Sequence, residues 1–236
     1  MKPLIIIAGI VAASVACAFG GPKPQHFDTL GSATEATDTA TDSTAMPMIE
    51  SVYDFFLITD EFATIDSSVR LDMLDYYASG MRKHMSTRLS GEAVIDSIAG
   101  NDYMKVTTSS VSETEVRMYA AKSGGKVFAV VNRVKLPAVD CRLRVVKDTD
   151  NGLIELPFAA PTVDDFLTVN DKKLKKDLLS RFDFTLIDYQ FLPDGAIEAR
   201  LSTDGYLPRE DAAAVAPYVK KCLTYAWNGK NLKLKK

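Results

Sequence analysis

From residue 102 onward the apolar residues of this chain follow a period of two, and this period restricts the fold more than any other feature. Successive side chains of a β-strand point to opposite faces of a sheet, so the period predicts strands. Turn sequences separate the segments, among them Ser123-Gly124-Gly125 and Asp150-Asn151-Gly152, and such turns favour antiparallel hairpins. The expected strands are residues 104–108, 114–121, 127–136 and 141–147.

Helices are expected before this sheet. Residues 49–57 predict a helix with a wide apolar side. Asp66-Ser67-Ser68 supplies the start of a second helix that ends near Gly80. Residues 89–98 are ambiguous, and we interpret them as an extended turn followed by a short helix.

The second half of the chain repeats this order in a shorter form. Residues 171–180 predict an amphipathic helix, and further strands are expected at 183–191, 196–202, 219–227 and 231–235. We therefore predict an α+β fold with two tandem units, residues 48–160 and 161–236, packed as one globular body. In each unit helices precede an antiparallel sheet and cover one of its faces, and the other face is solvated.

The first twenty residues are typical of a secretory signal. Lys2 precedes a small and apolar run, residues 4–16, which is shorter than the roughly 20 residues that span a bilayer. We expect residues 1–20 to act as a signal peptide and the protein to be exported. Cleavage after Ala18 or after Gly20, which leaves Phe19 or Gly21 as the new N-terminus, would give a periplasmic protein, and this fate is favoured. Alternatively, Ser14-Val15-Ala16-Cys17 resembles a lipobox, and a lipid on Cys17 would then be the membrane anchor.

Residues 21–47 predict a disordered linker between the signal and the fold. Thr, Ala, Ser, Asp and Pro dominate this stretch, which therefore has too little apolar surface to offset the entropy lost on folding. It also matches a bacterial O-glycosylation sequon, in which Ser or Thr lies between an Asp and a small or apolar residue. The candidate acceptors are Thr29, Thr39 and Ser43.

Composition and motifs exclude several functional classes. The net charge of -3 argues against a nucleic-acid-binding protein, whose affinity depends on Lys and Arg that neutralise phosphates. The two histidines are His26 in the linker and His84 at a basic helix end, and no Gly-x-Ser-x-Gly elbow accompanies them. Residues 148–152 resemble a calcium loop, but the position of Gly152 indicates a turn. We therefore assign no catalytic residue, no metal site and no cofactor.

Cys141 and Cys222 are a candidate disulfide for an oxidising compartment. The apolar residues near Cys141 share its strand parity, whereas those around Cys222 have the opposite parity. The two side chains should then face different ways. Free thiols are favoured over a disulfide.

Several motifs of the folded region resemble a known family. They are residues 70–77, Gly80-Met81, Leu89-Ser90-Gly91, Asp96-Ser97-Ile98 and Tyr103. Because of these motifs, residues 48–236 resemble an uncharacterised domain-of-unknown-function family of exported Bacteroidales proteins. This resemblance implies export but no activity. The order of elements also resembles beta-lactamase-inhibitor-like and PepSY-like periplasmic domains, a likeness of fold that implies no function.

The sequence favours a binding surface over an active site. We hypothesise a non-enzymatic module that binds an unknown envelope protein, peptide or glycan through the solvated face of its sheet. The residues of this face are Glu115, Arg117, Tyr119, Arg142, Arg144, Glu198 and Arg200. The alternatives are a periplasmic hydrolase that uses carboxylates, and a lipid-anchored structural or accessory protein.

Overall fold

The structure, a computed structural model, describes residues 48–235, which belong to one compact unit. The predicted signal peptide and linker lie outside the described residues, and so do Cys17, Thr29, Thr39 and Ser43. Within the described part of the chain, no helix has both the length and the apolar character needed to cross a membrane.

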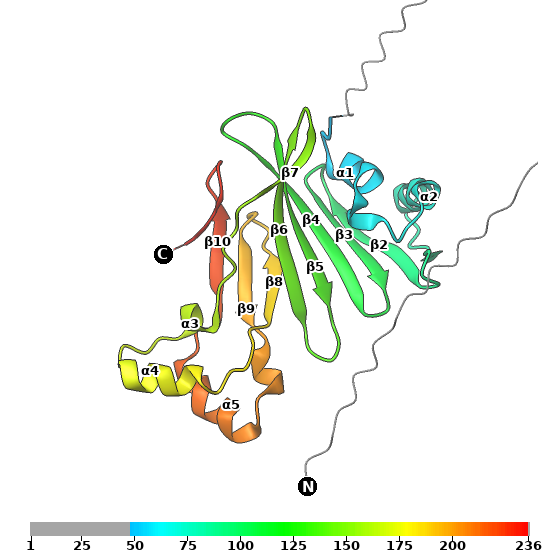
Figure 1. The fold of residues 1–236 in the computed structure, drawn as a ribbon. Coiled ribbons are helices and arrows are strands. Elements are labelled where there is room, and N and C mark those ends of the chain that lie inside the picture. Colours follow the sequence, from blue (N-terminus) through cyan, green and yellow to red (C-terminus); the bar gives the residue numbers. More distant parts are fainter. Residues whose placement is uncertain (1–47, 236) are drawn as a thin grey trace, which may run out of the picture. The chain divides into compact units, whose positions relative to one another are not determined.

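A seven-stranded antiparallel sheet contains most of the strands (Figure 1). Each strand pairs with the next one in the chain, so the sheet is a meander with β1 and β7 at its edges. The period of two between residues 102 and 147 therefore predicted four of its strands, β3 to β6, correctly. The strands are β1 Met85–Ser86, β2 Glu92–Ala99, β3 Tyr103–Ser109, β4 Ser112–Ala120, β5 Lys126–Val134, β6 Asp140–Thr149 and β7 Gly152–Leu156.

Strand β2 lies where a turn and a short helix were expected, so that prediction was wrong. Ala93, Val94 and Ile95 are all buried, and the register with β3 shifts between Ile95 and Ser97. A bulge inserts an extra residue into one strand and breaks the alternation of its side chains. The period of two is consequently hidden in this part of the sequence.

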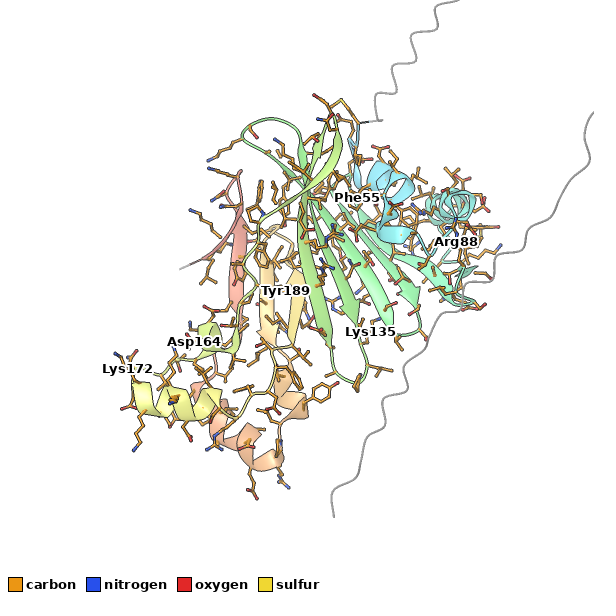
Figure 2. All side chains as sticks on the ribbon, in the orientation of Figure 1. Phe55, Arg88, Lys135, Asp164, Lys172 and Tyr189 are labelled. Atoms are coloured by element: carbon orange, nitrogen blue, oxygen red, sulfur yellow. The ribbon has the colours of Figure 1, made fainter. Side chains whose placement is uncertain are left out.

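Helices α1 (Val52–Ile58) and α2 (Ser67–Ala78) cover one face of the sheet, and the 3-10 turn η1 (Asp60–Phe62) lies between them (Figure 1). Ser51 caps α1, since its side chain accepts a hydrogen bond from the backbone of Asp54. Phe55 of α1 lies over the sheet (Figure 2) and packs against Phe128 of β5, with ring centroids 4.6 Å apart. Burial of these rings holds the helices on the sheet.

Arg70 of α2 fastens the two helices together. It is 6% exposed, and its guanidinium donates hydrogen bonds to backbone carbonyls around the end of α1. The last carbonyls of a helix have no partner within the helix and carry its negative dipole end, so they stabilise a buried cation. The four acceptors, at 2.9–3.1 Å, belong to Phe56, Leu57, Thr59 and Ile65.

A four-stranded antiparallel sheet covers the opposite face of the first sheet. Its order is β11 (Leu232–Leu234), β10 (Leu223–Trp227), β9 (Ile197–Leu201) and β8 (Ile187–Phe191). Ala129 and Val131 of β5 share one core with residues of this sheet, among them Tyr189, which is labelled in Figure 2. The expectation that the second face of the first sheet is solvated was therefore wrong. Apolar residues on that face are buried by the second sheet.

Three helices pack together in a third apolar cluster, which includes Leu178 and Val215. They are α3 (Val163–Phe166), α4 (Lys172–Leu179) and α5 (Arg209–Val215). The 3-10 turns η2 (Thr203–Tyr206) and η3 (Ala216–Tyr218) flank α5, and all three lie between β9 and β10, where no helix was expected. The fold is thus α+β, with helices and antiparallel sheets. The description as two tandem repeats stays a prediction.

Candidate functional site

The predicted binding residues of the first sheet lie on two opposite faces. Residues paired across antiparallel strands share a face. Glu115 pairs with Val131, so it lies on the face that the second sheet covers. Arg142 and Arg144 lie on the other face, where Arg144 binds Glu61 of η1.

Arg117 and Tyr119 hold the two sheets together. Arg117 donates to the carbonyl oxygen of Leu192 at 3.2 Å, and the Tyr119 hydroxyl donates to that of Gly195 at 2.8 Å. Both acceptors belong to the turn between β8 and β9. The polar groups of Arg117 and Tyr119 are therefore engaged in hydrogen bonds within the fold.

Glu198 and Arg200 lie on the second sheet and form an ion pair with each other. The seven predicted residues consequently do not form the single solvated face that was expected. Strand register separates those on the first sheet, and the second sheet covers part of the surface that the sequence left open.

A buried charge network lies where β8 meets β4 and β5. Arg133 of β5 is 7% exposed, and its Nε donates to Asp188 of β8 at 2.9 Å. Its other nitrogens donate to Glu113 and Glu115 of β4 and to the carbonyl oxygen of Tyr189. One guanidinium therefore binds three carboxylates from two different sheets.

Two lysines complete this network, beside a cavity of about 490 Å³. Lys135 and Lys105 donate to Glu113 at 2.6 and 2.9 Å. Burial by itself raises the pKa of Glu113, but hydrogen bonds from Lys135, Lys105 and Arg133 outweigh it and lower the pKa to about 2. Efficient general acids and bases have pKa values near the working pH. Glu113 is therefore suited to holding the charge network together, and it is poorly suited to act as the general acid or base of the hydrolase considered as an alternative.

The thiols of Cys141 and Cys222 are both free, and the candidate disulfide is not formed. Burial raises the pKa of Cys141 to about 12, so this thiol is protonated and unreactive at neutral pH. Among residues 48–235, no group of three histidine, cysteine or acidic side chains is placed to hold a metal ion.

Strand β7 is an exposed edge of the seven-stranded sheet. Within the described residues its strand neighbour is β6 alone. An edge strand has one row of backbone N–H and C=O groups without a strand partner, and proteins often protect such an edge with lysine or proline. Neither residue type occurs in β7, where Leu153 and Ile154 are 36% and 48% exposed. This edge is therefore open to pairing with another chain.

A pocket of about 380 Å³ lies beside β7 on the helix side of the sheet. We call it the Leu153 pocket, and its apolar walls include Ile49, Ile58 and Leu153. Its polar wall contains Arg144, whose Nε donates to Glu155 of β7 at 3.0 Å. The polar wall also contains Asp60, Glu61 and Asp148, and Glu61 and Glu155 pair with Arg144, so the pocket offers an apolar space beside the free edge.

A second pocket, of about 500 Å³, lies beside β7 on the other side of the sheet, and we call it the Trp227 pocket. The indole of Trp227 is held in place by a hydrogen bond and by stacking. Its Nε1 donates to the carbonyl oxygen of Ala120 at 2.8 Å, and its ring stacks on Tyr119. The centroids of these two rings are 5.6 Å apart. The apolar walls of the pocket are formed by Val127, Ile154, Leu156, Pro157 and Trp227.

This site lies outside the residues that the sequence predicts to bind a partner. The part of the sequence that could have indicated this site is the segment Gly152–Leu156, which follows the Asn-Gly turn and precedes Pro157. In this segment apolar residues occupy both faces of one short strand, and no lysine or proline protects the edge. The turn predicts a hairpin, but no local pattern shows that the second strand of this hairpin ends the sheet.

Comparisons with known proteins agree with the expected family but add no activity. A solved structure of a domain of an uncharacterised protein from Porphyromonas gingivalis W83 has a TM-score of 0.63 and 16% identity. The match covers 78% of this chain and 97% of that chain, and at this identity it shows the fold alone. No curated protein matches, and the likeness to beta-lactamase-inhibitor-like and PepSY-like domains is not confirmed. The model of a family described as protein of unknown function (DUF3256) matches residues 49–232, and the chain therefore belongs to this family.

Proposed function

We propose that this chain is an exported, non-enzymatic binding module that captures an extended polypeptide segment as an additional strand beside β7. One observation carries the proposal: the free edge of β7 lies between two preformed pockets, one on each face of the sheet. The backbone edge supplies affinity through main-chain hydrogen bonds, and the pockets supply specificity through side chains.

The geometry of a strand defines what the captured segment contains. Adjacent side chains of a strand point to opposite faces. One side chain of the added strand would enter the Leu153 pocket, and the next would enter the Trp227 pocket. Both pockets have apolar walls, so the segment carries two adjacent apolar residues.

Peptides methylated on their backbone nitrogens test this mode of binding. The probes are capped peptides of about eight residues, a usual strand length, with two adjacent leucines between threonines. Methylation of every second amide removes the donors of one edge of the peptide. The alternate amides form two sets, one on each edge of the peptide, and each set is one methylation phase. We expect methylation of one set to abolish binding to the full chain and methylation of the other set to leave binding intact, as measured by calorimetry. Equal binding in both phases would contradict strand addition.

A substitution on the edge provides the matched control. Leu153→Lys places a charge on β7, as natural edge strands do, and we expect peptide affinity to fall by at least about tenfold. Leu89→Lys changes a leucine that is 78% exposed and lies far from β7 in the chain, and it should bind as the wild type does. If the full chain is instead a dimer that Leu153→Lys converts to a monomer, β7 pairs with a second copy and the proposed partner is wrong.

Export is part of the proposal and is supported by the signal character of residues 1–20. The intact mass of the protein purified from its native host tests it. Cleavage predicts a chain that begins near Phe19, and lipidation predicts one that begins at a modified Cys17. A chain that retains Met1 would contradict export.

A further inference from the structure

Three lysines lie on the rim of the Trp227 pocket. They are Lys122 in the turn between β4 and β5, Lys147 of β6, and Lys230 in the turn between β10 and β11. Their side chains come from three separate parts of the chain, and the fold brings them together around one apolar space. A cationic rim on an apolar pocket is complementary to a ligand that is both apolar and acidic.

Among the described residues, these lysines have no acidic partner. No ion pair of the described residues includes Lys122, Lys147 or Lys230, and Lys147 instead donates to the Ser123 hydroxyl at 3.0 Å. Nearby lysines differ, since Lys126 pairs with Glu50 at 3.4 Å. The positive charge on the rim is therefore available to a ligand.

We propose that the segment captured at β7 carries a carboxylate next to the apolar side chain that enters the Trp227 pocket. This inference rests on the proposed function, because strand addition determines where the carboxylate lies. Residues two positions apart share a face of a strand. An Asp or Glu two positions from the anchor, or a free C-terminal carboxylate at that place, would therefore face the three lysines.

Charge-matched peptides test the inference on the full chain. The neutral probe is the capped leucine peptide described above, and three derivatives of it are compared. The first has glutamate two positions from the second leucine, the second has glutamine at the same place, and the third ends there in a free carboxylate. We expect both carboxylate peptides to bind about tenfold more tightly than the glutamine peptide. The gain should shrink as salt rises, because charges are screened over about 10 Å at 0.1 M.

Substitution of the rim identifies the cations responsible. The triple variant Lys122→Gln, Lys147→Gln and Lys230→Gln should lose the gain from the carboxylate and keep the affinity for the neutral probe. The matched control replaces Lys172, Lys173 and Lys176, which are exposed on α4, with glutamine and should behave as the wild type does.

The possible outcomes separate this inference from the proposed function. If the neutral probe binds in one methylation phase only but a carboxylate does not increase its affinity, strand addition is supported and the inference of an acidic partner is wrong. If no peptide binds, both are wrong. If laurate binds the pocket with the same loss in the triple lysine variant and peptides do not compete, the occupant is a fatty acid and the inference is overturned.

Discussion

The substitution Arg133→Met is expected to lower the free energy of unfolding by about 3–5 kcal/mol, which is typical for removal of one partner from a buried ion network. Arg133 is the cation that Glu113, Glu115 and Asp188 share. Methionine fills a similar volume, so the loss reflects carboxylates that remain buried without their partner. Because Glu115 is 6% exposed, water cannot replace the lost hydrogen bonds fully.

Chemical denaturation with urea measures this loss, and Arg200→Met is the matched control. Arg200 also pairs with a glutamate, but its side chain is 52% exposed, so the control should change stability by less than about 1 kcal/mol. Thermal unfolding should show the same order, with a decrease of roughly 10 °C for Arg133→Met. A stability close to that of the wild type would mean that the network does not hold the two sheets together.

Acidification is expected to remove roughly 3 kcal/mol of stability through Glu113 alone. The pKa of this carboxyl is about 2 in the fold, against 4.5 without the fold. The unfolded chain therefore binds a proton more readily than the folded chain does. Stability from this group is complete above pH 4.5 and is lost as the pH falls toward 2.

Urea denaturation between pH 7 and pH 2 tests this dependence in the wild type and in Glu113→Gln. The variant should be less stable at pH 7, and its stability should fall less steeply below pH 4.5, because glutamine does not titrate. Glu210→Gln, at an exposed residue of α5, should keep the slope of the wild type. If the Glu113→Gln curve is parallel to that of the wild type, another carboxyl is responsible for the acid sensitivity.

The elements of the fold could mostly be read from local patterns. The period of two located β3 to β6, and the turn sequence at Asn151-Gly152 located the hairpin that ends in β7. The pattern failed at β2, where a bulge near Asp96 breaks the alternation. It also could not reveal α5, which interrupts the strands of the second sheet.

The candidate site could not be read in the same way. The alternation of polar residues in β4 and β6 suggested one solvated face, but the register places Glu115 and Arg144 on opposite sides of the sheet. The Trp227 pocket combines residues from β5, β7 and the C-terminal hairpin. No local pattern links these segments, since they meet only when the second sheet packs on the first.

The sequence by itself determined the α+β class, most of the strands and the family, because periodicity, turn residues and motifs are properties of short segments. Only the tertiary structure decided which faces are buried and which edge remains open. Arg133 and Asp188, for example, are 55 residues apart in the chain and meet through the packing of two sheets. Such contacts depend on strand register and on the contact between sheets, and both arise only when distant parts of the chain bury their apolar surfaces together.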